Sequence, residues 1–270
     1  MGNKKKLPRK CVCVLPVYNE QKTLADILQR VWRYVDILVC INDGSNDQSL
    51  SLLTEFVATH SNVYLVNLEK NQGMAGALKA GFLFIEYLNK KKYIGPDDIV
   101  ITMDADGQHY PESIPGACQY FLKNKLDILL AQRDFSLYPK YKIIGNKFLS
   151  FTNSILSGYT YHDVESGFRL LKVKTLKPIL AYYTGIRYSC AQEIALISAR
   201  LKYKVDNNYR INIAYYRPGT TVVDGLIVLS ISGLTWIRLL LKKGMIVDTA
   251  DQLMRKNFNK SISLRKTNYT

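Results

Sequence analysis

Residues 99–112 read Ile-Val-Ile-Thr-Met-Asp-Ala-Asp-Gly-Gln-His-Tyr-Pro-Glu, and this stretch decides how the chain is interpreted. Its first five residues are apolar or β-branched, which predicts a buried strand over 99–103. The strand leads into Asp104 and Asp106, whose spacing aims both carboxylates to one side of an extended backbone. In open α/β sheets, ligands bind at the carboxyl ends of the strands. We therefore expect two carboxylates at a ligand-binding edge.

Two interpretations of this pair are open from the local sequence. Two hard oxygen ligands with open positions beside them suit Mg²⁺ or Mn²⁺ carrying a substrate diphosphate. A solvated acidic turn that binds nothing has the same local sequence. The neighbouring motifs along the chain decide between the two.

The first half of the chain alternates between two kinds of hydrophobic pattern. Strands are expected over 11–17, 36–41, 63–68, 99–103 and 127–131, and helices over 20–34, 47–60, 74–89 and 111–123. This alternation predicts a mostly parallel sheet sandwiched by helices. In the less regular second half we expect helices over 141–156 and 189–201, an extended piece over 166–171 and a strand over 210–215.

No linker rich in Pro, Gly or Ser interrupts this order, so one main domain is expected. We divide the chain into a basic N-terminal tail (1–10), an α/β domain (11–221) and a C-terminal extension (222–270). Within the extension, residues 225–241 are almost all apolar but include Arg238. A membrane span needs about 20 apolar residues. An amphipathic helix in the membrane interface is favoured, with a core helix and a short span as alternatives.

The composition of the 270 residues favours anionic partners. There are 37 Lys and Arg against 22 Asp and Glu, a net charge of +15, and 47% of the residues are hydrophobic. The charge suits anionic lipid, phosphorylated substrates or nucleic acid, although solvated basic ends would look the same. The five cysteines include no C-x-x-C pair, and no signal peptide is visible. Buried, reduced cysteines and a cytoplasmic location are expected.

Five motifs in order carry a family resemblance. They are Pro-Val-Tyr-Asn-Glu (16–20), Asn-Asp-Gly-Ser-Asn-Asp (42–47), Asn-Gln-Gly-Met-Ala-Gly-Ala (71–77), the stretch 103–112 and Asp-Val-Glu-Ser-Gly-Phe-Arg (163–169). Together they resemble the inverting family 2 glycosyltransferases of the GT-A fold, a Rossmann-like nucleotide-diphospho-sugar transferase fold. The nearest branch includes dolichol-phosphate mannosyltransferases and polyprenyl-phosphate glycosyltransferases. The resemblance covers roughly residues 11–221.

The resemblance implies a role for each matching residue. The nucleotide sugar would be held by Pro16, Tyr18, Glu20, Asp43, Asn71, Gly73, Asp104, Ala105, Arg133 and Arg217. Asp104, Asp106 and Gln108 would hold Mn²⁺ or Mg²⁺, and Ser166, Gly167 and Arg169 would face the acceptor. For Arg133 the alternative to phosphate binding is an ordinary surface charge beside Asp134. For Arg169 the alternative is an ion pair with Asp163 or Glu165 that fixes the loop.

Two further positions bear on catalysis. Asp106 and Glu193 would be the catalytic residues, with Glu193 as general base for a hydroxyl acceptor or, alternatively, an exposed glutamate on a helix. Arg217 resembles the arginine of a family loop that closes over the donor phosphates. In that loop Thr221 replaces a serine and Val222 replaces a lysine, so one cation is lost.

The expected function is metal-dependent inverting transfer of a sugar from a UDP- or GDP-sugar to a polyprenyl phosphate, at the cytoplasmic face of a membrane. A hydroxyl of a cell-surface polysaccharide or lipid-linked oligosaccharide is the alternative acceptor. A non-catalytic nucleotide-sugar-binding adaptor is a more remote alternative. A sugar nucleotidyltransferase is disfavoured because no glycine-rich loop follows the first strand. Nucleic acid is not expected as a partner, because carboxylates would repel its phosphates.

Overall fold

The fold is described from a computed structural model, which covers residues 9–135, 138–214 and 222–244. Its main element is a seven-stranded sheet with the order β3-β2-β1-β4-β7-β5-β8. The strands are β1 (Cys11–Val17), β2 (Ile37–Asp43), β3 (Val63–Leu68), β4 (Ile99–Thr102), β5 (Ile128–Leu130), β7 (Arg169–Lys172) and β8 (Val205–Asp206). All neighbours pair in parallel except β7, which is antiparallel to β4 and β5.

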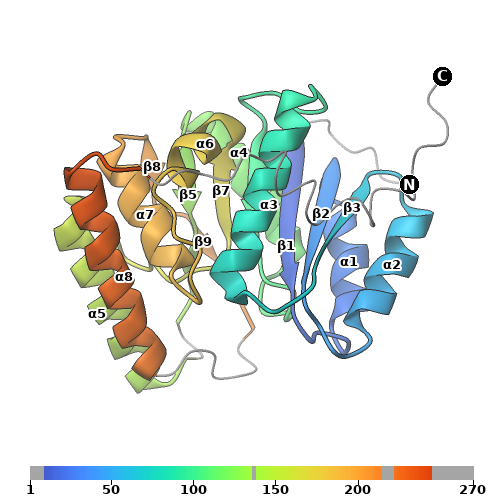
Figure 1. The fold of residues 1–270 in the computed structure, drawn as a ribbon, viewed down its shortest axis with the longest axis horizontal. Helices are drawn as coiled ribbons and strands as arrows, with labels where there is room; N and C mark the ends of the chain where they lie inside the picture. Colours follow the sequence, from blue (N-terminus) through green and yellow to red (C-terminus); the bar gives the residue numbers. More distant parts are fainter. Residues whose placement is uncertain (1–8, 136–137, 215–221, 245–270) are drawn as a thin grey trace.

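Helices cover both faces of this sheet (Figure 1). They are α1 (Leu24–Trp32), α2 (Ser49–Thr59), α3 (Gly73–Lys90), the short 3₁₀ turn η1 (Pro111–Ser113), α4 (Ile114–Lys123), α5 (Lys140–Ser157), α6 (Val173–Leu180), α7 (Cys190–Arg200) and α8 (Val222–Leu240). A second, two-stranded sheet joins β6 (Gln132–Arg133) to β9 (Arg210–Ile211). The expected mostly parallel sheet between helical layers is confirmed.

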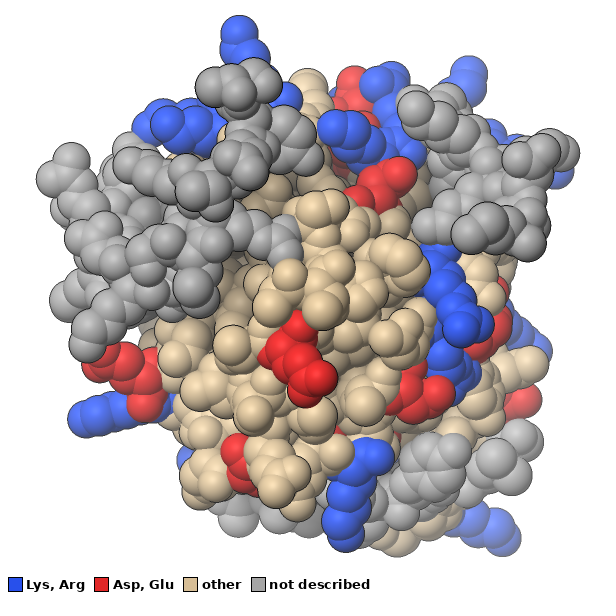
Figure 2. Space-filling view, turned by 90° about the vertical axis from the view of Figure 1, so that its right-hand side faces the viewer, with Lys and Arg blue, Asp and Glu red and all other residues tan. Residues whose placement is uncertain are grey.

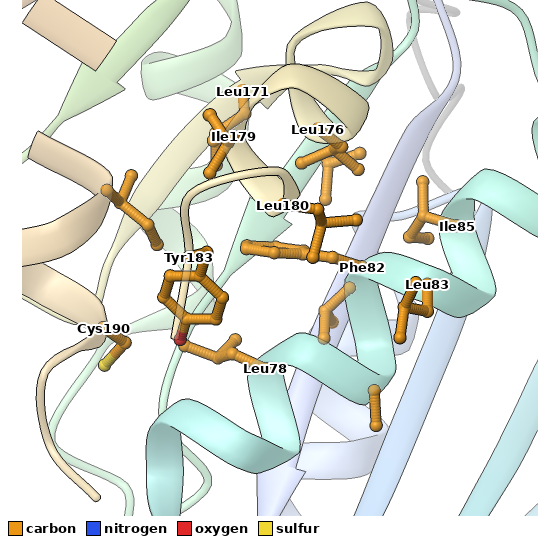
Figure 3. Packing of buried hydrophobic residues seen from close by; sticks show 14 of the residues in the cluster. Leu78, Phe82, Leu83, Ile85, Leu171, Leu176, Ile179, Leu180, Tyr183 and Cys190 are labelled. Carbon is orange, nitrogen blue, oxygen red and sulfur yellow. The ribbon is translucent and has the colours of Figure 1, made fainter. Parts of the chain in front are cut away.

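Alternate residues of the central strands supply two separate hydrophobic clusters. Val12 and Val14 of β1 face the cluster shared with α3, α6 and α7, whereas Cys11 and Cys13 face the cluster shared with α1 and α4. This follows from the two-residue period of a strand that is buried on both sides. In the first cluster, Figure 3 shows Phe82 of α3 beside Leu180 of α6 and the ring of Tyr183.

Three expectations differ from the observed elements. Helix α6 lies over residues that the sequence left unassigned, and its apolar positions pack onto the sheet through Leu176 and Ile179. Among the described residues, the strand expected over 210–215 is reduced to β9, because the strand that pairs with it, β6, is two residues long; residue 215 lies outside the described part. The extended piece expected over 166–171 becomes β7, shifted toward 172 and inserted antiparallel between β4 and β5.

Helices α5 and α8 lie side by side at one end of the molecule, beyond α7 (Figure 1). Helix α8 contains the 225–241 segment for which three placements were open. It buries Val228, Ile231 and Thr235 and exposes Leu234 and Ile237. In the part of the chain that the structure describes, no helix combines the length and apolar character needed to cross a bilayer.

Candidate functional site

A wide cleft lies at the carboxyl ends of β1, β2 and β4, where the sheet order reverses. From β1 the chain builds outward to β2 and β3, then returns to place β4 on the other side of β1. Such a switch point opens a crevice in which α/β proteins bind ligands. Predicted residues that line the cleft are Pro16, Tyr18, Glu20, Asp43, Asn71, Gly73, Asp104, Ala105, Asp106, Gln108, Arg133, Gly167 and Arg169. The topology thus brings most of the predicted site together.

The side of the cleft next to β1 and β2 offers one aromatic ring and two carboxylates. Tyr18 follows β1 and is 45% exposed, and Glu20 lines the cleft beside it. Asp43 ends β2, is buried and accepts the backbone N–H of Gln72 at 2.7 Å. Burial raises the pKa of Asp43, against the opposing effect of hydrogen bonds from the Gln72 and Gly73 backbone. Asp43 therefore holds the backbone of the 71–73 turn in place at the rim of the cleft by hydrogen bonding.

Asp104 and Asp106 follow β4 on the floor of the cleft. Burial raises the pKa of Asp104, and burial together with the charge of Asp104 raises the pKa of Asp106. The neighbouring His109 accepts the Asp104 backbone N–H at its Nδ1 over 3.3 Å. Burial lowers the pKa of His109 to about 4, so the ring is neutral at neutral pH and supplies no counter-charge. The pair is a site where a cation would relieve two crowded negative charges.

Gln108, which was predicted as a third oxygen ligand for this cation, is hydrogen-bonded to Asp106. Gln108 donates its side-chain Nε2 to Asp106 Oδ2 at 2.7 Å and its backbone N–H to Asp106 Oδ1 at 2.9 Å. In this arrangement Gln108 orients Asp106, and its role as a third oxygen ligand stays a prediction. Among the described residues, no group of three or more His, Cys, Asp or Glu side chains could hold a metal. Two carboxylates with the remaining positions left to substrate and water fit Mg²⁺ or Mn²⁺.

The 163–169 segment lies directly against the carboxylate pair. A Cβ atom on Gly167 would stand 2.4 Å from Asp104 Oδ2, so only glycine leaves room for that carboxylate. Thr102 anchors the segment by donating its hydroxyl to the Gly167 carbonyl at 2.9 Å. Ser166, which was expected to face the acceptor, is buried and does not line the cleft.

Two arginines face the cleft near the acidic pair. Arg133 holds Asp163 in a two-point ion pair, with Nε to Oδ2 at 2.9 Å and Nη2 to Oδ1 at 2.8 Å. The alternative of a surface charge beside Asp134 is wrong for Arg133. Arg169 is buried, and its Nε has no hydrogen-bond partner among the described residues. A buried guanidinium at a cleft with an unused donor suits a phosphate or carboxylate oxygen.

Glu193 is placed behind the cleft, which contradicts the expectation that it faces the acceptor. Its side chain is fully buried and accepts hydrogen bonds from Thr184 N (3.0 Å), Thr184 Oγ1 (2.8 Å), Ser189 Oγ (2.7 Å) and Thr235 Oγ1 (2.8 Å). These bonds tie α7 to α8 and to the 184–189 loop. A general base must reach the proton of the substrate, so this position does not fit that role. Its alternative, an exposed glutamate, is also wrong.

Arg217 and Thr221 of the predicted phosphate loop lie outside the described residues. Only the backbone of Val222 is described, as the first residue of α8. The role expected for this loop therefore stays a prediction.

One wall of the cleft and one carboxylate in it were not predicted from the sequence. Tyr141, Phe148 and Leu149 of α5 and Leu226 and Leu229 of α8 line the cleft. A helical apolar stripe is ordinarily assigned to the core, so its place on a cleft wall carried no separate signal.

Glu165 also lines the cleft, beside Gly167 and Arg169. It accepts Gln192 Nε2 at 2.7 Å, and burial raises its pKa against that hydrogen bond. The only sequence signal was its place in the 163–169 motif, where we considered it as a partner for Arg169.

Comparison with known proteins supports the geometric picture. The sequence model of the protein family described as "Glycosyl transferase family 2" matches residues 12–180. The chain is 27% identical over 210 residues to the UDP-N-acetylglucosamine–dolichyl-phosphate N-acetylglucosaminyltransferase of Methanococcus voltae, covering 71% of this chain and 81% of that protein. It is 31% identical over 190 residues to the undecaprenyl-phosphate 4-deoxy-4-formamido-L-arabinose transferase of Pectobacterium atrosepticum, covering 62% and 54% respectively.

Solved structures confirm the fold. Glucosyl-3-phosphoglycerate synthase from Mycobacterium tuberculosis in complex with UDP superposes with a TM-score of 0.62 at 14% identity, covering 85% of this chain and 80% of that one. The same enzyme with Mn²⁺ and UDP-glucose gives a TM-score of 0.58 at 15% identity, with coverages of 87% and 79%. The predicted GT-A architecture is thus confirmed, and the family resemblance is confirmed by the model match over more than half of the chain. The chain belongs to glycosyl transferase family 2.

Proposed function

We propose that this glycosyltransferase moves a sugar, with inversion, from a nucleoside diphosphate sugar to a polyprenyl phosphate, and that it uses Mn²⁺ or Mg²⁺ to do so. The observation that carries the proposal is the make-up of the cleft. It joins an acidic pair, two guanidinium groups and an apolar wall within one space. A donor diphosphate, an acceptor phosphate and a hydrocarbon chain each find a matching surface there.

The acidic pair and the nucleotide side of the cleft suit the donor. Asp104 and Asp106 would hold the divalent cation, and this cation supplies Lewis-acid stabilisation of charge on the departing diphosphate. Tyr18, Glu20 and Asp43 would hold base and ribose by stacking and hydrogen bonding. One structure of the solved neighbour contains UDP, and another contains UDP-glucose and Mn²⁺. This supports a nucleotide sugar as donor here.

The arginines and the apolar wall suit the acceptor. The free donor of Arg169 and the nearby guanidinium of Arg133 would hold a phosphate and aim one of its oxygens at the sugar. A phosphate is already anionic, so the nucleophile needs no general base, which agrees with the burial of Glu193. The names of two relatives describe transfer to dolichyl phosphate and to undecaprenyl phosphate.

The donor half of the proposal is tested by ligand-induced stabilisation. Melting temperatures are measured with UDP, GDP, CMP and dTDP, each with and without Mn²⁺, for the wild type and Asp106→Asn. A ligand at about 100 times its dissociation constant adds about 2.7 kcal/mol of stability. One nucleotide should raise the melting temperature with metal only, and Asp106→Asn should lose that increment. If no nucleotide stabilises the wild type under any condition, the proposed donor is wrong.

A second candidate acceptor, a sugar hydroxyl, is favoured by Glu165. This carboxylate lies in the cleft with a raised pKa, as a general base for a hydroxyl requires. With a hydroxyl acceptor, Glu165→Gln should lower kcat about 10²–10⁴-fold. With a phosphate acceptor the same change should leave kcat within about threefold, because no proton has to be removed. Transfer rates of this variant to polyprenyl phosphate and to a glycan acceptor separate the two.

A further inference from the structure

Helix α5 has the reverse of the usual polarity of a surface helix. Its buried positions are polar: Asn146, Ser150, Asn153 and Ser157. Its large apolar side chains point outward, with exposed fractions of 63% for Tyr141, 68% for Ile144, 55% for Phe148, 63% for Phe151 and 64% for Ile155. These five residues recur at alternating steps of three and four, so they form one continuous stripe along the helix.

The polar side of α5 is engaged within the protein. Asn153 donates to the side chain and the carbonyl of Gln192 on α7 at 2.6 and 2.9 Å. Ser150 accepts the Val164 backbone N–H at 3.1 Å, and Asn146 donates to Asp163 at 3.1 Å. The polarity of α5 is therefore specified by hydrogen bonds that hold its apolar stripe outward.

Helix α8 extends this stripe into a wider surface. It packs beside α5 and exposes Leu226, Leu234, Ile237 and Leu240, while Ser232 and Thr235 are buried. We refer to the exposed apolar residues of α5 and α8 as the apolar face. A contiguous exposed apolar surface formed by two neighbouring helices is typical of an interaction surface. At the opposite end of the molecule, Figure 2 shows acidic and basic side chains interspersed around uncharged ones.

The charges around the apolar face have one sign. Helix α5 carries Lys140, Lys142 and Lys147 and no acidic residue, and Lys242 and Lys243 follow α8. Asp224 is the single acidic residue of α8, and it is buried in an ion pair with Arg187 at 3.0 Å. Lysine around an apolar surface suits a layer of anionic head groups over hydrocarbon. A second copy docked symmetrically would bring this basic surface against itself.

We propose that the apolar face rests on the surface of an anionic lipid bilayer. Phe148 and Leu226 belong both to this face and to the lining of the cleft. Docking in this way turns the mouth of the cleft toward the lipid. For an acceptor phosphate on a polyprenyl chain, which rests on the proposed function, the head group then reaches Arg169 while the chain stays in the bilayer.

The test measures binding to vesicles of phosphatidylcholine alone and of phosphatidylcholine mixed with phosphatidylglycerol. The variant replaces Ile144, Phe151 and Ile155 together by serine; these residues lie on the face but do not line the cleft. The wild type should sediment with the anionic vesicles, and the triple variant should bind them at least about tenfold more weakly. Tyr93→Ser is the matched control, because Tyr93 is 56% exposed, follows α3 and lies outside the face. Its binding should equal that of the wild type.

Several outcomes overturn the docking proposal. They are wild-type protein that ignores both kinds of vesicle, a triple variant that binds like the wild type, and equal binding to neutral and anionic vesicles. A wild-type dimer that the triple variant converts to monomer, without vesicle binding, assigns the face to a second copy and also overturns it. The melting temperature of the triple variant with nucleotide and Mn²⁺ reports the donor site separately. A retained ligand increment with lost vesicle binding therefore distinguishes a failure of docking from a failure of the proposed function.

Discussion

Glu193 is the residue whose role the structure changes most. It is buried and accepts four hydrogen bonds that link α7, α8 and the 184–189 loop. Glu193→Ala leaves these four buried donors without an acceptor, so we expect a loss of about 3 kcal/mol or more in the free energy of unfolding. Urea denaturation measures this loss. Glu193→Gln, which keeps an acceptor oxygen, should cost less, and both variants should retain nucleotide-dependent stabilisation. A stable Glu193→Gln variant whose kcat falls 10²-fold or more would instead restore the general-base role.

Glu165 gives a pH-dependent prediction at the same scale. Burial raises its pKa in the folded protein, so the folded state binds a proton more tightly than the unfolded chain does. The contribution of this group to stability is thus fully present below the ordinary glutamate pKa of about 4.3 and is lost as the pH rises through the raised value. Glu165→Gln removes the cost of the buried charge. It should melt higher than the wild type at neutral pH, and the difference should shrink as the pH falls.

Melting temperatures measured across that pH range check the Glu165 prediction. Glu55→Gln on the exposed surface of α2 is the matched control for removing one carboxylate. A wild type that is more stable than Glu165→Gln at neutral pH would contradict the argument.

At the scale of elements, the packing of α3 on the sheet rests on a glycine. A Cβ on Gly81 would meet Val14 Cγ1 of β1 at 2.4 Å, and Val14 is a buried, β-branched residue that has little room to move. Gly81→Ala gains at most about 1 kcal/mol in helix propensity and costs about 1–3 kcal/mol in overpacking. We therefore expect a lower urea midpoint. Gly233→Ala in α8, where nothing lies within 4 Å of the added Cβ, should raise the free energy of unfolding by about 0.5–1 kcal/mol and thus raise the midpoint. Equal midpoints would contradict this account.

At the scale of the whole molecule, the two hydrophobic clusters share the central strands. Phe82 lies in one cluster and Phe121 in the other, and both are fully buried. Because alternate residues of β1 and β4 supply both clusters, neither cluster is expected to unfold alone. Phe82→Ala and Phe121→Ala should each lower the stability by about 3–5 kcal/mol and keep a single transition. Calorimetry checks this, and two resolved transitions in either variant would show that the layers unfold independently.

Much of the site was predictable because its geometry follows from local pattern and topology. β3 and β4 were predicted to within one residue, and the polar residues after β1, β2 and β4 meet at one edge because parallel strands end together. The partner of Arg133 was not predictable from spacing, since Asp163 reaches it from a distant loop. The burial of Glu193 depended on four donors, three hydroxyls and one backbone amide, which are assembled only where α7, α8 and the 184–189 loop pack together.

The sequence by itself determined the alternation of strands and helices, the carboxylates at the strand ends and the membership of glycosyl transferase family 2. These follow from residue periodicity and from motifs in a set order, which need no knowledge of long-range contacts. Only the tertiary structure decided that β7 runs antiparallel, that Glu193 is buried and that α5 turns its polar side inward. A helical period marks two faces of a helix but leaves open which one faces the core. In α5 that choice was made by hydrogen bonds to α7 and to the 163–164 segment.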